Sequence, residues 1–241
     1  WRAPANTPAY RKGSVLIAEP LSAAECEEIS EETLPQASTA SQHSARRVLE
    51  LLEAVAVMIQ RHAGQLGDID AVAGDGDHGI GMERGILGAV EKAREVAARG
   101  AGAGSLLCRA ADAWADKAGG TSGALWGVAL TALGTALGDS AAADAPRVAA
   151  GVRDAKEGIM HFGKARVGDK TMVDVLVPFS DTLSAAVAQG ASLTEAWLRA
   201  AAVAEQAAQA TAQLVPKVGR ARPLAEKSVG TPDAGAVSLA M

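Results

Sequence analysis

Eight segments with helical character follow one another from about residue 42 to the end of the chain, separated by Gly- or Pro-bearing breaks. In the first segment Val48, Leu51, Leu52 and Val55 recur at intervals of three and four residues, as on one face of a helix. The other segments are expected at about 79–98, 103–117, 121–138, 145–162, 170–189, 193–214 and 233–241. The breaks between them are expected at 66–78, 99–104, 118–123, 138–146, 163–169, 190–192 and 215–232. Similar lengths predict an up-and-down bundle.

The composition supports the all-α prediction. Hydrophobic residues make up 49% of the 241 residues, whereas aromatic residues make up only 3%. Ala, Leu and Val must therefore build most of the core, and Ala and Leu are among the strongest helix formers. Small side chains also allow helices to approach one another closely.

The charge distribution and one long apolar segment bear on the kind of partner. A formal net charge of −5 argues against a nucleic-acid partner, which requires a basic face. Residues 118–138 carry no charge and reach the roughly 20 residues that span a bilayer. However, this segment opens with Gly-Gly-Thr-Ser-Gly and lacks a flanking aromatic belt, so we expect a buried helix and no membrane partner.

Residues 1–41 differ from the rest of the chain, because they are rich in Pro, then in acidic residues, Ser and Thr. We interpret them as the tail of a preceding domain and an interdomain linker, with Ser38 or Ser41 capping the first helix. The chain is therefore expected to be cut from a longer polypeptide. No signal peptide is visible, and Cys26 and Cys108 show no C-x-x-C spacing, so a cytoplasmic location is expected.

Three aspartates lie close together in the sequence GDIDAVAGDGDHG, at positions 70, 75 and 77. Converging carboxylates repel one another unless a cation lies between them, and their hard oxygen atoms favour Mg²⁺ or Ca²⁺. The alternative is that the aspartates form turns and cap the next helix. Three aspartates with His78 in nine residues favour the metal site. The G-x-G-x-x-G pattern at 74–79 does not indicate a Rossmann loop, because aspartates there would repel a bare phosphate.

Three further loops carry residues suited to an anionic ligand. Residues 119–123, Gly-Gly-Thr-Ser-Gly, open a helix and offer backbone N–H groups and hydroxyls, although a close-packing corner is the alternative. In Gly-Asp-Lys-Thr-Met, Asp169 is expected to cap a helix that begins near Lys170, and Met172 could face a ligand or the core. The loop 217–235 is basic, and Asp233 is expected to cap the last helix.

Together these loops resemble the nucleotide-binding domain of dihydroxyacetone kinases, known as the DhaL or DAK2 domain. The matching stretches occur in the family's order and are GDGDHG at 74–79, GGTSG at 119–123, GDKTM at 168–172, GRA at 219–221 and SVGTPDAG at 228–235. The resemblance covers about residues 42–241. It implies an eight-helix antiparallel barrel that holds ATP at one end.

The resemblance also implies roles for individual residues. Asp70, Asp75 and Asp77 would bind two Mg²⁺ ions that hold the phosphates of ATP or ADP. The nucleotide site would be lined by His78, Gly79, Ile80, Gly81, Thr121, Ser122, Gly163, Thr171, Met172, Arg220, Asp233, Ala234 and Gly235. A catalytic-base role for His78 is an alternative to contact with the nucleotide.

In the family the sugar is held on a histidine of a separate DhaK domain, so that domain is the expected partner. The implied reaction transfers the γ-phosphoryl group of Mg-ATP to a small ketose or aldose such as dihydroxyacetone, glyceraldehyde or a four-carbon ketose. The full-length kinase is expected to be a homodimer. Two alternatives remain: an ADP-retaining DhaL subunit of a phosphotransferase-dependent kinase, and a non-catalytic lipid-binding bundle.

Overall fold

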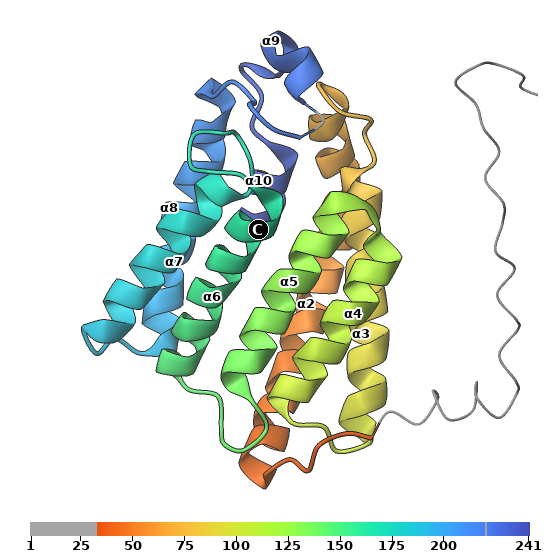
Figure 1. Ribbon diagram of the computed structural model, residues 1–241, viewed down its shortest axis with the longest axis vertical. Helices are drawn as coiled ribbons and strands as arrows, with labels where there is room; N and C mark the ends of the chain where they lie inside the picture. Colours follow the sequence, from red (N-terminus) through yellow and green to blue (C-terminus); the bar gives the residue numbers. More distant parts are fainter. Residues whose placement is uncertain (1–32, 220) are drawn as a thin grey trace, which may run out of the picture. The chain divides into compact units, whose positions relative to one another are not determined.

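A computed structural model describes residues 33–219 and 221–241 of this chain (Figure 1). From Leu34 onward the chain forms one compact unit. The linker predicted for residues 1–41 lies mostly outside the described residues, as does Cys26, and it stays a prediction. Cys108 is a free cysteine.

The described residues form helices and contain no strand. The long helices are α2 (Thr39–Ala71), α3 (His78–Ala98), α4 (Ala103–Ala118), α5 (Gly120–Leu137), α6 (Ala145–Gly163), α7 (Val173–Ala188) and α8 (Leu193–Ala210). The C-terminal part contains the 3₁₀ turns η1 (Thr211–Gln213) and η2 (Arg222–Leu224) and the short helices α9 (Ala225–Ser228) and α10 (Ala234–Ala240). The all-α prediction is confirmed.

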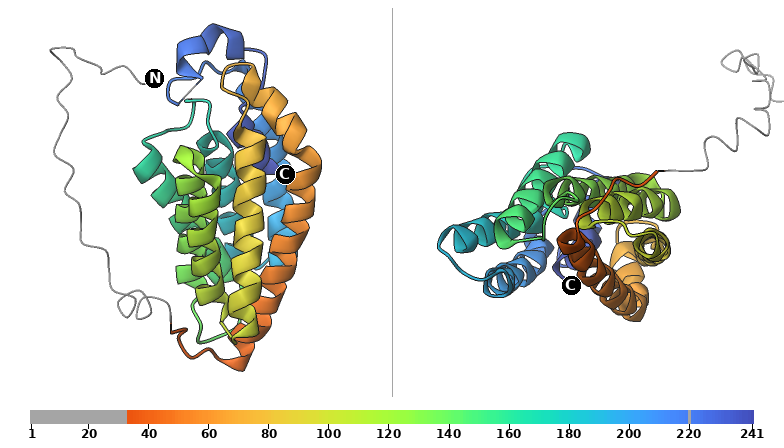
Figure 2. Two further views of the ribbon diagram at one scale, coloured as in Figure 1. Left: turned by 90° about the vertical axis from the view of Figure 1, so that its right-hand side faces the viewer. Right: turned by 90° about the horizontal axis from the view of Figure 1, so that it is seen from below.

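The helices form a closed ring (Figure 2). Each long helix from α2 to α8 packs against the next one in the chain, and α10 contacts α2, α7 and α8. Helix α10 therefore occupies the last position between α8 and α2. The predicted eight-helix antiparallel barrel is confirmed by α2–α8 together with α10, and α9 adds one turn in the connection before α10.

The barrel is packed through small residues. Ala89, Ala93, Ala110, Ala196 and Ala200 are completely buried. Helices α4 and α5 approach closely at Gly104, where an added Cβ atom would lie 2.8 Å from the Gly134 carbonyl oxygen in α5 and 2.7 Å from the Cα atom of Gly138, which follows α5. This explains how a chain with so few aromatic residues fills its core, because short side chains bring the helix backbones together.

Two predicted helix boundaries are wrong. The break predicted at 66–78 starts too early, because α2 continues through Gly67 to Ala71, and the burial of Leu66 stabilises this last stretch. The helix predicted to begin near Lys170 begins at Val173, because Lys170 has a left-handed backbone with φ of 60°. Asp169 is consequently not a helix cap; it accepts a hydrogen bond from the Arg166 amide at 2.8 Å.

Two predicted caps are confirmed. The Ser38 hydroxyl accepts a hydrogen bond from the Ser41 amide at 3.1 Å, and the Asp233 carboxylate accepts one from the Ala236 amide at 2.8 Å. Both side chains satisfy an amide that the first helical turn leaves without an intrahelical partner. The last predicted long segment, 193–214, ends as an α-helix at Ala210 and continues as η1.

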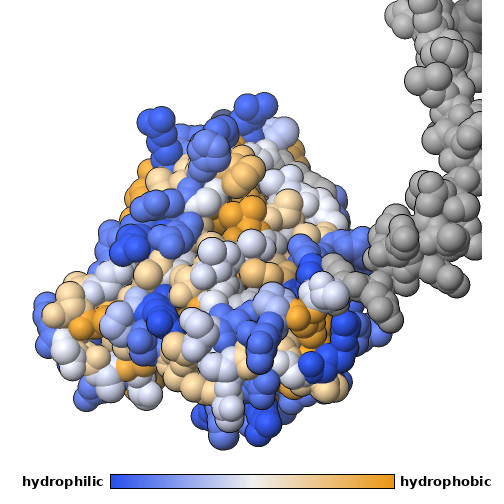
Figure 3. All heavy atoms as spheres, turned by 60° about the horizontal axis from the view of Figure 1, so that its bottom comes forward, coloured by the Kyte–Doolittle hydropathy of each residue, from blue (hydrophilic) through white to orange (hydrophobic). Residues whose placement is uncertain are grey.

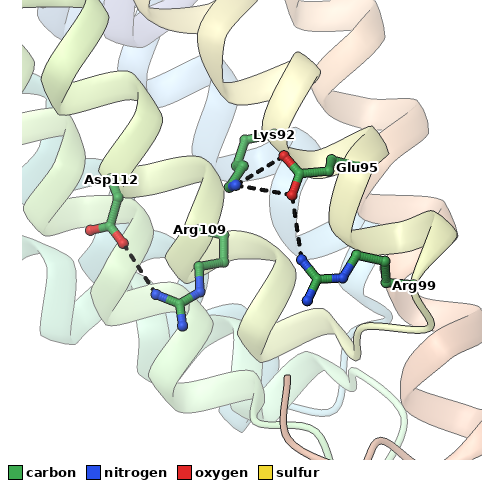
Figure 4. A network of polar contacts seen from close by, with 5 residues as sticks. All are labelled: Lys92, Glu95, Arg99, Arg109 and Asp112. Atoms are coloured by element: carbon green, nitrogen blue, oxygen red, sulfur yellow. Dashed lines mark hydrogen bonds and ion pairs between the residues drawn. The ribbon is translucent and has the colours of Figure 1, made fainter. Parts of the chain in front are cut away.

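The outer surface contributes less to stability than the core. Lys92, Glu95 and Arg99 form ion pairs along α3, and Arg109 pairs with Asp112 on α4 (Figure 4). Ion pairs between such solvent-accessible groups are typically worth about 0–1 kcal/mol. The face shown in Figure 3 carries hydrophobic residues in separate groups among hydrophilic ones. Within the described part of the chain, none of the helices combines the length and apolarity that crossing a bilayer requires.

We expect Gly104→Ala to lower the free energy of unfolding by about 2 kcal/mol, because the new methyl group forces α4 and α5 apart. Gly64→Ala is the matched control, since Gly64 lies within α2 with open space around it. This second variant should raise the free energy of unfolding by about 0.5–1 kcal/mol through helix propensity. Urea unfolding followed by circular dichroism measures both, and equal stability of Gly104→Ala and the wild type would contradict the packing argument.

Candidate functional site

A cavity of about 560 Å³ opens at one end of the barrel, where the loops between helices meet. The loop 72–77 joins α2 and α3 at this end, which is also the end of α9 in Figure 1. The wall of the cavity has a polar part, made of carboxylates, hydroxyls and glycine backbone. Its apolar part is formed by Met82, Trp114, Leu125, Trp126 and Ile159. The cavity therefore offers separate polar and apolar surfaces to one ligand.

The three aspartates lie together at the rim of this cavity. Asp70 lies in the last turn of α2, and Asp77 occupies the N-cap position of α3. One carboxylate oxygen from each of Asp70, Asp75 and Asp77 lies within 4.8 Å of the other two. A set of hard oxygen atoms at this spacing fits a cation such as Mg²⁺. The donor set therefore suits the metal ion that the sequence implies.

The backbone of the loop holds the aspartates in this arrangement. The Gly74 amide donates a hydrogen bond to the Asp70 carbonyl at 2.6 Å, so the chain turns sharply after α2. Gly76 follows with φ of 76°, a conformation that residues with a side chain rarely adopt. The His78 amide then donates to the Asp70 carboxylate at 3.4 Å. Gly74 and Gly76 thus allow the backbone to bend between α2 and α3.

His78 connects the start of α3 to α10. Its Nε2 atom lies 2.9 Å from the Ser238 hydroxyl, and that hydroxyl donates to the Gly235 carbonyl at 3.1 Å. Burial lowers the pKa of His78, and the nearby Asp70 carboxylate opposes this effect only in part. The imidazole is therefore neutral near pH 7. Its hydrogen bond holds together two walls of the cavity that are 160 residues apart in the chain.

The N-terminus of α5 also faces the cavity. Gly119 and Gly120 have φ of 65° and 60°, and Thr121 and Ser122 follow in the first helical turn. All four residues line the cavity. The first amides of a helix lack intrahelical partners and lie at the positive end of its dipole, so this corner suits an anion.

The remaining polar wall comes from the loop before α7 and the turn before α10. Gly163, Thr171, Met172, Asp233, Ala234 and Gly235 all line the cavity. Met172 is also buried against Ile159 and Val173, so it belongs to the core and to the cavity wall at once. Burial raises the pKa of Asp233 to about 6, although its hydrogen bond from the Ala236 amide acts in the opposite direction.

Of the residues that the resemblance implies, Gly79 and Arg220 are the ones not placed in this wall. Gly79 packs against α2, where an added Cβ atom would overlap the carbonyl group of Ala63. It therefore brings α2 and α3 together next to the aspartates. Arg220 lies outside the described residues. The other implied residues line one cavity, and their roles in binding stay a prediction.

Several residues of the wall were not predicted as site residues, among them Arg84, Trp114, Trp126 and Lys170. The rings of Trp114 and Trp126 stack with their centroids 5.2 Å apart. They come from different helices, so no local motif joins them. In the sequence, only the scarcity of tryptophan draws attention to these two residues, because the chain contains four tryptophans.

Fold and site together define a helical barrel with a carboxylate-lined cavity at one end, suited to a metal-bound anion. The chain belongs to the DAK2 domain family, which residues 72–241 match. It is 62% identical to the L-erythrulose kinase of Pectobacterium atrosepticum over 100% of this chain and 41% of that protein. It is 50% identical to the D-erythrulose kinase of Mycolicibacterium smegmatis over 100% of this chain and 42% of that protein.

A shorter relative is the ADP-binding subunit DhaL of the PEP-dependent dihydroxyacetone kinase of Escherichia coli. It is 34% identical, over 72% of this chain and 82% of that subunit. The dihydroxyacetone kinase of C. freundii in its native form shares the fold, with a TM-score of 0.61 and 24% identity over 95% of this chain and 37% of that one. The chain thus spans about two fifths of the length of the erythrulose kinases.

We expect Asp233→Asn to change how the stability of the metal-free protein depends on pH. The pKa of Asp233 is raised in the folded state from 3.8 to about 6, so its contribution to stability is complete below pH 3.8 and is lost as the pH rises through about 6. Asn keeps an oxygen that can accept from the Ala236 amide but does not ionise. The stability difference between the variant and the wild type should therefore grow by about 3 kcal/mol, in favour of the variant, between pH 3.5 and 7.

Urea unfolding in EDTA at both pH values measures this difference. Asp144→Asn is the control, because the Asp144 carboxylate caps α6 by accepting a similar hydrogen bond from the Arg147 amide at 2.9 Å, but Asp144 is exposed. A stability difference for Asp233→Asn that is the same at both pH values would show that desolvation does not act on this carboxyl.

Proposed function

We propose that this chain is the nucleotide-binding part of an ATP-dependent ketose kinase, which transfers the γ-phosphoryl group of Mg-ATP to a small ketose. The observation that carries the proposal is the trio of carboxylates, within 4.8 Å of one another, at a cavity that also contains a helix N-terminus. Carboxylates alone would repel a triphosphate. Their presence beside an anion-binding corner makes sense where metal ions join the two.

Asp70, Asp75 and Asp77 would hold two Mg²⁺ ions. Bound there, the metal supplies positive charge that offsets the charge of the transferring phosphoryl group. The α5 N-terminus with Thr121 and Ser122 would bind phosphate oxygens through amides and hydroxyls. Met172 and the stacked pair Trp114–Trp126 would contact the apolar faces of the adenine ring. The ADP-binding name of the 34% identical E. coli subunit supports a nucleotide ligand.

We favour a four-carbon ketose, erythrulose, as the acceptor over dihydroxyacetone. Three relatives at 62%, 50% and 45% identity over the whole chain are named as kinases of L- or D-erythrulose. The acceptor would be held by a DhaK-type domain outside these residues. The chain spans only about two fifths of the length of the erythrulose kinases, so the relatives contain a further part that could hold the sugar. A homodimer of the complete kinase and a cytoplasmic location remain part of the proposal.

The rival function is that of a phosphotransferase-dependent subunit, in which ADP stays bound and is rephosphorylated in place. The name of the E. coli relative supports this alternative. Two differences favour the ATP-using kinase: the erythrulose kinases show higher identity, and their similarity extends over the whole chain rather than 72% of it.

We expect Asp75→Ala to weaken Mg²⁺-dependent ATP binding at least about 100-fold, or roughly 2.7 kcal/mol, while the helical circular dichroism signal stays unchanged. The reason is that one of three metal ligands is lost from an exposed loop. Asp68→Ala is the matched control, because Asp68 is an exposed aspartate of the same stretch that does not line the cavity. Isothermal titration calorimetry with and without Mg²⁺ provides the affinities. An unchanged ATP affinity in Asp75→Ala would overturn the metal assignment.

Exchange of bound nucleotide distinguishes the two kinase functions. For the ATP-using kinase, labelled ADP preloaded with Mg²⁺ should leave within seconds after excess unlabelled ATP is added, because product must depart in every cycle. Filter binding over time measures the label that remains. Retention for an hour would favour the ADP-retaining subunit instead, and failure to load ADP at all would contradict both functions.

A further inference from the structure

Lys170 adopts an unusual conformation for a residue with a side chain. Its φ of 60° lies in the left-handed region, which costs a non-glycine residue on the order of 1 kcal/mol or more. Its side chain is also buried, with 4% of the residue exposed. Burying an ammonium group is unfavourable unless partners replace the water it loses. Both costs indicate that the Lys170 side chain makes contacts that offset them.

These contacts join two distant points of the chain. The Lys170 ammonium donates one hydrogen bond to the Leu214 carbonyl at 3.2 Å and another to the Ser228 carbonyl at 2.6 Å. Leu214 follows η1, and Ser228 ends α9, so the two carbonyls mark the beginning and the end of one connection. The nearby Asp233 carboxylate adds electrostatic attraction for the ammonium. One buried cation therefore links the loop before α7 to both ends of the connection 214–228.

This connection forms part of the cavity wall. Val218, Gly219 and Ala221 line the cavity and lie between the two carbonyls that Lys170 holds. A second tie, the ion pair of Lys217 with Asp169 at 3.7 Å, joins the same two loops. Lys217 is 63% exposed, however, and an exposed pair is worth little. The buried Lys170 contacts therefore hold the connection more strongly than this exposed ion pair does.

We propose that Lys170 is a positioning residue that sets how long a nucleotide stays bound, by holding Val218, Gly219 and Ala221 against the cavity. This inference rests on the proposed nucleotide-binding function. Glycine would fit the backbone at position 170 without strain, but it would leave both carbonyls without the ammonium. Lysine at this position therefore strains the backbone, but its ammonium group fixes the cavity wall.

The test compares Lys170→Met with a matched control, Lys164→Met. Lys164 also has a left-handed backbone, with φ of 56°, but its side chain is exposed. Release of a fluorescent ADP analogue, loaded with Mg²⁺ and displaced by excess ATP in a stopped-flow instrument, gives the dissociation rate. Lys170→Met should release the analogue about tenfold faster than the wild type, and Lys164→Met at the wild-type rate. Lys170→Arg, which keeps a cationic donor, should restore slow release at least in part.

Amide hydrogen exchange of the nucleotide-free protein tests the hold on the connection independently. The Lys217 and Gly230 amides donate hydrogen bonds to the Asp169 and Ala212 carbonyls, so they report on the anchoring of the connection. Lys170→Met should raise their exchange at least about fivefold and leave amides in the middle of α3 and α4 unchanged. This result would show that Lys170 positions the cavity wall even if the wild type bound no nucleotide, whereas failure to bind nucleotide would defeat the proposed function and, with it, the role of Lys170 in nucleotide release.

Two results would overturn the inference. One is release and exchange in Lys170→Met at wild-type rates, which would show that the ammonium does not hold the wall. The other is loss of the helical circular dichroism signal in that variant, which would show that Lys170 maintains the fold rather than the position of one loop.

Discussion

The close contact between α2 and α3 at Gly79 is the constraint on which the site depends. A Cβ atom at Gly79 would overlap the Ala63 carbonyl, so the two helices meet at backbone distance beside the cavity. The connection 72–77 is therefore short and must reverse direction sharply. This brings Asp77, at the start of α3, back to Asp70, at the end of α2. Helix packing thus places like charges together, and a cation between them would offset the energetic cost of their repulsion.

The opposite wall depends on a helix that is too short to be stable alone. Helix α10 has seven residues, well below the length at which an isolated helix persists in water. Three features hold it: the Asp233 cap, its packing against α2, α7 and α8, and the hydrogen bond between His78 and Ser238. The same hydrogen bond joins α10 to the aspartate loop. Closure of the barrel and assembly of the cavity consequently depend on the same contacts, because α10 must meet α2 and the start of α3 for both.

Local sequence signals predicted the helices, two caps and the aspartate trio, since spacing, N-cap chemistry and charge are encoded over a few neighbouring residues. The features that the sequence did not predict depend on contacts between residues that are distant in the chain. Glycine at position 67 suggested a break, but the burial of Leu66 keeps α2 intact to Ala71. The close approach of Gly79 to Ala63 of α2 joins residues 16 positions apart and could not be predicted from the glycine pattern alone. The partners of Lys170 lie 44 and 58 residues away, a separation over which no local pattern carries information.

The names of the relatives bear on the proposed division of labour, in which this barrel holds the phosphoryl donor and another part of the kinase holds the acceptor. The M. smegmatis proteins named for D-erythrulose and L-erythrulose are 50% and 45% identical to this chain over its whole length. Kinases named for opposite enantiomers are thus about equally similar to this part. Recognition of a sugar's handedness requires directed hydrogen bonds to its hydroxyl groups, whereas a metal-bound triphosphate requires only charge and amides at fixed distances. Under the proposed function, a donor domain of this kind does not select the sugar, and discrimination falls to the part of the kinase that holds the acceptor.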